Sequence, residues 1–124
     1  MKDNRPVNLD IGTMRLPVTA WTSITHRATG VFLFAGMAFL IWALDASLRS
    51  PESFASLQDT LGSPLARLVL WAILAALIYH SLAGVRHLIM DMGVGESMEG
   101  GARGARIVIA LAVVLTLLAG VWIW

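Results

Sequence analysis

His80 is the residue whose position most needs a chemical explanation. It lies within an apolar run, about ten residues before the polar end of that run near Asp91. If the run is a helix, His80 is roughly 15 Å deep, close to the middle of a bilayer. Ionisable side chains at that depth are costly and usually functional. An imidazole there makes an interhelical hydrogen bond or coordinates a haem iron, a role that suits neutral imidazole in a dry site.

A haem iron with two axial ligands needs a second histidine on the opposite face of the porphyrin. The remaining histidines of the chain are His26 and His87. His87 follows on the same helix as His80, about 10 Å away and on the same side, so the two rings cannot hold one iron between them. We expect His26 near the membrane surface, half a bilayer away from His80 in depth. The second ligand would then come from a partner subunit.

A second polar group, formed by Ser23, His26 and Arg27, lies just before an apolar run. Pro17 can begin a short interfacial helix, which places the three on one face at i, i+3 and i+4. Ordinary boundary chemistry is one explanation, in which Arg27 reaches the headgroups, Ser23 bonds to its own backbone and His26 is solvated. The other is a quinone site, because a quinone carbonyl needs hydrogen-bond donors and a nearby cation while its isoprenoid tail stays in lipid.

Three apolar runs must position these side chains, at residues 28–48, 65–90 and 105–124. Each is close to the ~20 residues with which a helix crosses a bilayer. The connecting segments are rich in Gly, Pro, Ser and charge, which predicts solvent-facing loops. The chain is 57% hydrophobic and 14% charged, too little charge to cover a soluble core of this size. We therefore predict an all-α membrane protein, one domain over residues 1–124, in which residues 1–27 form a cytoplasmic and interfacial segment before three transmembrane helices.

The placement of charge and tryptophan predicts the orientation of the spans. Two cations flank the first loop and seven precede the first run or surround the second loop, namely Arg49 and Arg67 against Lys2, Arg5, Arg15, Arg27, Arg86, Arg103 and Arg106. The positive-inside rule then predicts a cytoplasmic N-terminus and a periplasmic C-terminus, and four tryptophans at the outer ends of the runs agree. The N-terminal residues resemble neither a signal peptide nor a mitochondrial presequence, which favours a bacterial inner membrane.

Two separated motifs are similar to those of the cytochrome b subunit of succinate dehydrogenase, the larger membrane anchor of complex II. The segment RPVNLDIGTMRLPVTAWTSITHRATG holds an S-x-x-H-R-x-T core, and H-x-x-x-G-x-R-H followed by an aspartate lies within HSLAGVRHLIMD. The similarity covers essentially the whole chain. It implies that His80 is an axial ligand of haem b, with iron as the metal. It also implies that Ser23 and Arg27 contact ubiquinone, and that His26 and Arg27 lie beside the haem propionates.

The resemblance also implies the partners of the chain. A smaller membrane anchor would supply the second haem histidine, and an iron-sulfur subunit and a flavoprotein subunit would deliver electrons from succinate. The polar segments of this chain are too short for a flavin domain, so it would not be catalytic alone. The rest of its surface would contact membrane lipid. Its net charge of +1 does not indicate nucleic-acid binding.

Three alternatives stay open beside this interpretation. A fumarate reductase anchor has the same composition and spacing. A structural anchor without a cofactor would use His80 and Arg27 only for packing. A small transporter or channel subunit is less favoured, since such proteins typically place a carboxylate within a span or interrupt a span with Gly and Pro.

Overall fold

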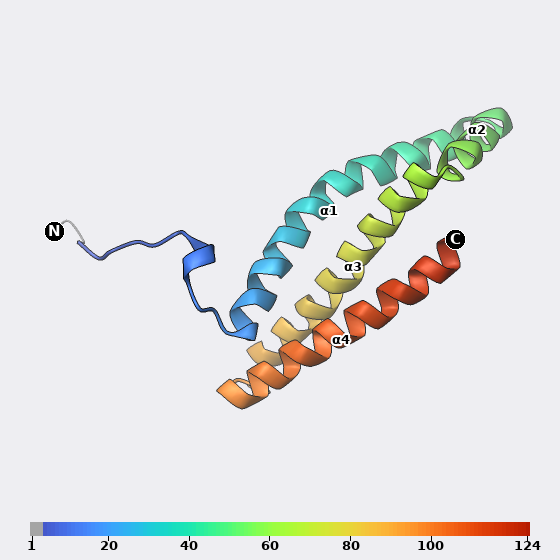
Figure 1. The fold of residues 1–124 in the computed structure, drawn as a ribbon. Coiled ribbons are helices and arrows are strands. Elements are labelled where there is room, and N and C mark those ends of the chain that lie inside the picture. The colour runs from blue at the N-terminus through green and yellow to red at the C-terminus, as the bar shows by residue number, and fades with distance from the viewer. Residues whose placement is uncertain (1–3) are drawn as a thin grey trace.

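The computed structural model describes residues 4–124, and every regular element in that range is helical. Three helices are long and apolar enough to cross a membrane, which confirms the all-α class with three spans. The elements are a 3₁₀ turn η1 (Ile11–Thr13) and the helices α1 (Val18–Arg49), α2 (Pro51–Leu61), α3 (Pro64–Asp91) and α4 (Met98–Ile123), shown in Figure 1. Lys2, one of the cations used to predict orientation, lies outside the described residues.

Helix α1 begins ten residues before the predicted span, so the short interfacial helix is not a separate element. Pro17 is the N-cap residue, and no further proline occurs before Pro51. Nothing therefore ends the helix between the polar segment and the apolar run. The 32 residues of α1 form a rod about 48 Å long at about 1.5 Å per residue, longer than the ~30 Å hydrocarbon core. The extra length of α1 is accommodated if its polar first turns extend into the headgroup layer or if the helix tilts.

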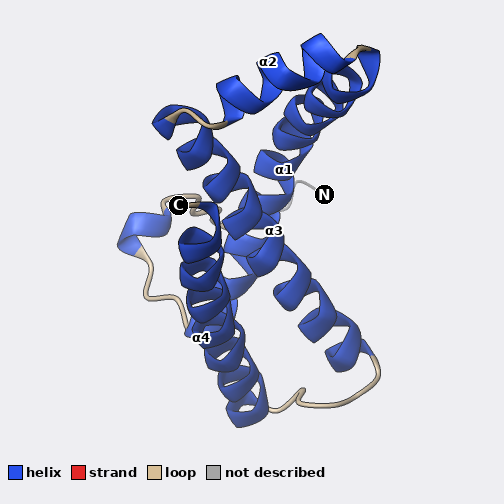
Figure 2. Ribbon diagram, turned by 90° about the vertical axis from the view of Figure 1, so that its right-hand side faces the viewer, coloured by secondary structure: helices blue, strands red, loops and turns tan. Residues whose placement is uncertain are grey.

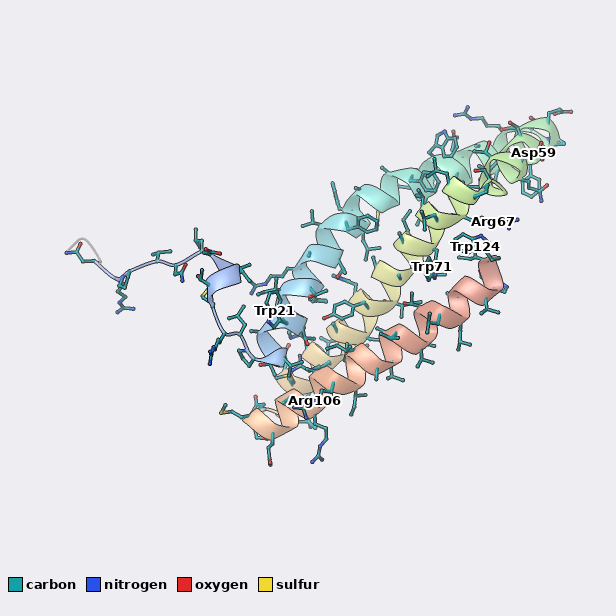
Figure 3. All side chains as sticks on the ribbon, viewed as in Figure 1. Trp21, Asp59, Arg67, Trp71, Arg106 and Trp124 are labelled. Atoms are coloured by element: carbon teal, nitrogen blue, oxygen red, sulfur yellow. The ribbon has the colours of Figure 1, made fainter. Side chains whose placement is uncertain are left out.

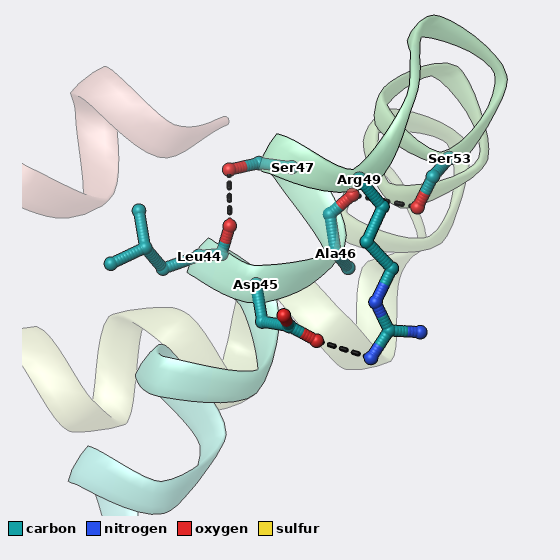
Figure 4. A network of polar contacts seen from close by, with 6 residues as sticks. All are labelled: Leu44, Asp45, Ala46, Ser47, Arg49 and Ser53. Atoms are coloured by element: carbon teal, nitrogen blue, oxygen red, sulfur yellow. Dashed lines mark hydrogen bonds and ion pairs between the residues drawn. The ribbon is translucent and has the colours of Figure 1, made fainter.

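The first predicted loop is largely wrong, because most of it forms α2. Local signals explain the helix: the Ser50 hydroxyl accepts a hydrogen bond from the Ser53 amide at 3.0 Å, and Pro51 occupies the first turn. Helix α2 lies across one end of the long helices and connects α1 to α3 (Figure 2). Its Leu57 side chain is buried. Figure 4 shows the α1–α2 junction, where the Ser53 hydroxyl donates to the Ala46 carbonyl at 2.6 Å.

At the same junction, Arg49 and Asp45 form an ion pair one helical turn apart (Figure 4). Both side chains are exposed, so the pair contributes little to stability. Asp45, for which the sequence indicates no functional role, is accounted for by this pair.

Helix α3 lies between α1 and α4 (Figure 1), and most of the buried residues of these three helices are Gly or Ala. Ala83 and Ala105 are fully buried, and Gly36 packs on the side chain of Ile73. The chain nevertheless buries only 11–17% of the apolar windows of its three spans, and side chains project outward along all of them (Figure 3). These exposed apolar faces require lipid or another polypeptide to cover them.

Trp71 fixes the C-terminal end of α4 to α3 (Figure 3). Its indole nitrogen donates to the Thr116 carbonyl at 2.8 Å, its ring lies edge-on to Trp124, and Gly120 leaves room for it. We expect Trp71→Phe to lower the free energy of unfolding in detergent by about 1 kcal/mol, because a part-buried hydrogen bond is lost while most ring contacts remain. Trp122→Phe is the control, since Trp122 is 83% exposed. Equal thermal stability of the two variants would contradict this role.

Candidate functional site

The three histidines of the chain meet at the contact between α1 and α3. The rings of His26 and His80 are stacked, with centroids 4.2 Å apart and planes 13° from parallel. His87 lies on the other side, its centroid 5.1 Å from that of His26 at an angle of 51°. His26 therefore lies between two histidines of α3.

The predicted difference in depth between His26 and His80 is wrong. His26 lies eight residues after the start of α1, and His80 lies eleven residues before the end of α3, at the same end of the bundle. These offsets are about 12 and 16 Å along the two helices, so the rings lie at nearly the same level. The predicted span begins at residue 28, whereas the helix begins at Val18, so His26 lies within the helix rather than before it.

The backbone of α1 fixes the hydrogen-bonding state of His80. Its Nδ1 lies 3.0 Å from the His26 carbonyl and 3.2 Å from the Thr29 hydroxyl, which itself donates to that carbonyl at 2.9 Å. A carbonyl can only accept, so Nδ1 carries a proton, and in the neutral tautomer of this ring Nε2 has the lone pair. Nε2 makes no hydrogen bond to any residue in the described part of the chain. A neutral histidine anchored through one nitrogen is the usual form of a metal ligand.

Two glycines allow the rings to approach the facing helices. A Cβ at Gly30 would lie 3.0 Å from Cε1 of His80, and a Cβ at Gly84 would lie 3.5 Å from Nε2 of His26. Sequence reasoning missed both positions as packing determinants, although each glycine belongs to one of the two motifs. The spacing H-x-x-x-G places Gly84 one turn after His80, on the same face of the helix, and could have indicated that a facing helix approaches there.

Ser23, His26 and Arg27 lie at i, i+3 and i+4 of α1 but differ in their surroundings. His26 is directed toward α3, whereas Arg27 is exposed and forms no salt bridge with any described residue. Ser23, half-buried, follows Thr22, whose carbonyl accepts a hydrogen bond from the Tyr79 hydroxyl at 2.8 Å. Ser23 and Arg27 still offer a hydroxyl and a cation on one side of the helix, one turn apart.

Tyr79 is a site residue that sequence reasoning missed. It holds the backbone of α1 one residue before Ser23, and it precedes His80 directly on α3. A tyrosine within an apolar run next to a candidate ligand was the available signal, since a buried phenol hydroxyl requires a partner. Between residues 4 and 124, no cluster of three or more His, Asp or Glu side chains could hold a metal ion alone.

Comparison with known proteins adds the decisive observation. The family model described as succinate dehydrogenase/fumarate reductase transmembrane subunit matches residues 1–119. The chain belongs to this family. It is therefore a transmembrane subunit of the succinate dehydrogenase type, and the three apolar helices are its membrane spans.

The relatives are cytochrome b subunits of succinate dehydrogenase. The cytochrome b556 subunit of Coxiella burnetii is 40% identical over the whole of both chains. That of Paracoccus denitrificans is 39% identical over 94% of this chain and 90% of its own. The mitochondrial cytochrome b560 subunit of Sus scrofa is 33% identical over 89% of this chain and 66% of its own. This transmembrane subunit thus acts within an enzyme complex and is not catalytic alone, and its bacterial relatives agree with the expected bacterial membrane.

Proposed function

We propose that this subunit binds haem b jointly with a smaller anchor subunit and forms part of the ubiquinone-reduction site of a succinate:quinone oxidoreductase. The observation that carries the proposal is the hydrogen bond from His80 Nδ1 to the His26 carbonyl, which leaves Nε2 available to iron. When bound, haem supplies a reversible one-electron carrier within the membrane. The chain contributes the orientation of the imidazole, through Thr29, Gly30 and the stacked ring of His26.

The second histidine that would hold the haem would come from the smaller anchor. His26 cannot provide it for the same iron, because two nearly parallel rings 4.2 Å apart leave no space for a porphyrin between them. His87 lies on the same helix as His80 and beyond His26. The exposed apolar faces of α1 and α3 give the partner a surface to pack on.

The polar residues of α1 serve the periphery of the haem and the quinone. We assign His26 and Arg27 to the haem propionates, since His26 stacks on the His80 ring and Arg27, the next residue of α1, forms no salt bridge with any described residue. Ser23 and Arg27 serve the quinone: the hydroxyl donates to a carbonyl oxygen, and the guanidinium offsets the negative charge that develops there.

The orientation of the bundle in the membrane determines where the other subunits bind. With the cation-rich end of the bundle in the cytoplasm, Ser23 and Arg27 lie on the side where the iron-sulfur and flavoprotein subunits bind, and the C-terminus is periplasmic. Residues 1–124 then act as one membrane-anchor domain of the inner membrane. A fumarate reductase anchor would use the same residues with electrons moving in the opposite direction.

A reduced-minus-oxidised absorption spectrum of the purified complex tests the proposal. The chain is tagged, extracted in mild detergent with its partners and reduced with dithionite. We expect the α band of a b-type haem together with a second small membrane subunit. An intact complex without that band would instead identify a structural anchor that lacks a cofactor.

Enlarging Gly30 tests the packing that orients His80. We expect Gly30→Val to weaken haem retention by roughly 10–100-fold, as loss of outer-shell support for a metal ligand does, because its side chain would displace the His80 ring. Gly36→Val is the matched control on the same helix, since a Cβ at Gly36 would meet Ile73 and no histidine. Haem content in the assembled complexes is the readout, and equal haem loss in both variants would refute a specific effect.

A further inference from the structure

Arg86 is a buried cation that the proposed haem and quinone sites do not use. It is 8% exposed, and its Nη2 donates to the Gly101 carbonyl of α4 at 3.1 Å. Its Nε is buried without a hydrogen-bond partner, and no carboxylate of residues 4–124 forms a salt bridge with it. Arginine is rarely buried in a protein without a paired anion. The chain therefore positions a guanidinium whose counter-ion must come from elsewhere.

The sequence of α4 creates the space for this side chain. A Cβ at Gly104 would lie 3.2 Å from Nε of Arg86, and a Cβ at Gly101 would lie 3.9 Å from its Nη2. The glycine-rich first turns of α4 thus allow the guanidinium to lie against the helix backbone. Such a run of glycines weakens a helix, which favours a specific role for the space that they leave.

Arg86 lines a groove of about 460 Å³ between α3 and α4. Arg103 also lines the groove, and no acidic residue does. The rest of the lining is almost entirely apolar, and includes Leu82, Ile89 and Leu111.

The charged and apolar parts of the groove lie at different depths. Arg86 and Arg103 each lie five residues from the ends of α3 and α4 that the short loop joins. Leu111 lies eight residues beyond Arg103 on α4, about 12 Å further along the helix axis. The two cations are therefore at headgroup level and the apolar lining extends into the hydrocarbon layer.

We propose that this groove is a binding site for an anionic phospholipid of the surrounding leaflet. Its phosphate lies between Arg86 and Arg103, and one acyl chain follows the apolar lining toward Leu111. Basic pockets between transmembrane helices are a recognised setting for anionic headgroups, and guanidinium pairs phosphate through two parallel hydrogen bonds. The charge complementarity and the amphipathic depth profile together favour a lipid over an apolar helix of another subunit, which would bring no negative charge to the two arginines.

The test uses the assembled complex, depleted of lipid by detergent washing and titrated with dioleoylphosphatidylglycerol. Native mass spectrometry counts the retained lipid, with dioleoylphosphatidylcholine as the zwitterionic comparison. We expect Arg103→Gln to weaken retention of phosphatidylglycerol about fivefold, the effect of one basic residue at a membrane surface. Arg106→Gln is the matched control, since Arg106 is an exposed arginine on the same helix that does not line the groove.

A second pair of variants tests the acyl-chain part of the groove. Leu111→Trp fills the apolar lining without changing either arginine and should also reduce retention. Leu115→Trp, one turn further on α4 and outside the lining, should leave it unchanged. If Leu111→Trp retains lipid as the wild type does, no acyl chain lies in the groove.

Three results would overturn the proposal. Equal retention of phosphatidylglycerol and phosphatidylcholine, or no retention at all, shows that the groove is not an anionic lipid site. Displacement of the lipid by inorganic phosphate identifies a site for free anions. A shifted haem α band in Arg103→Gln assigns the arginines to a haem propionate. The proposal is independent of the haem and quinone assignments, so the absorption spectrum and quinone reduction should be unchanged in Arg103→Gln.

Discussion

The His80→Ala complex is expected to lose its b-type α band. If His80 holds the haem iron as proposed, its removal should weaken haem retention by more than the roughly 10–100-fold that follows loss of an outer-shell partner, because a direct ligand would be lost. The Nδ1 of His80 is held by the His26 carbonyl of α1, which orients this ring. The measurement is the reduced-minus-oxidised spectrum, together with the amount of haem per complex.

His87→Ala is the control for His80→Ala. His87 lies on the same helix and in the same cluster, but its ring contacts His26 rather than His80. We expect the α band to survive in His87→Ala and to return partly in His80→Ala when imidazole is added. A band that persists in His80→Ala and disappears in His87→Ala would reverse the ligand assignment.

The second large effect is expected on quinone reduction. Ser23→Ala and Arg27→Ala should each lower the rate of ubiquinone reduction by roughly 10²-fold, as loss of one donor to a developing negative charge does. Oxidation of succinate by an artificial dye should stay unchanged, because the dye would take electrons before they reach the proposed quinone site. Measuring both rates on the same preparation separates loss of the quinone site from loss of assembly.

The other end of α1 provides matched controls for these two residues. Ser47→Ala and Arg49→Ala change the same residue types at the end of the helix near α2, where their side chains make only local contacts. Both should retain ubiquinone reduction. Normal quinone kinetics in both Ser23→Ala and Arg27→Ala would remove these residues from the site.

The three spans could be predicted from the sequence because crossing a bilayer depends on local composition. About twenty apolar residues in a row satisfy the hydrocarbon layer whatever their neighbours are. The family could also be predicted, since its motifs are short and continuous along the chain, and His80 stood out because a single imidazole within an apolar run is unusual. Helix α2 was missed although Ser50 and Pro51 carried a start signal, because its composition resembles that of a loop.

The arrangement of the histidines was decided by the tertiary structure alone. Whether His26 meets His80 depends on where α1 begins and on how closely it approaches α3, and that approach depends on Gly30 and Gly84 in different helices. The burial of Arg86 likewise depends on glycines that follow it in the next helix. Sequence periodicity describes one helix at a time, so it determines which residues are available. The distance between side chains of two helices is set by packing, which determines what those residues can do together.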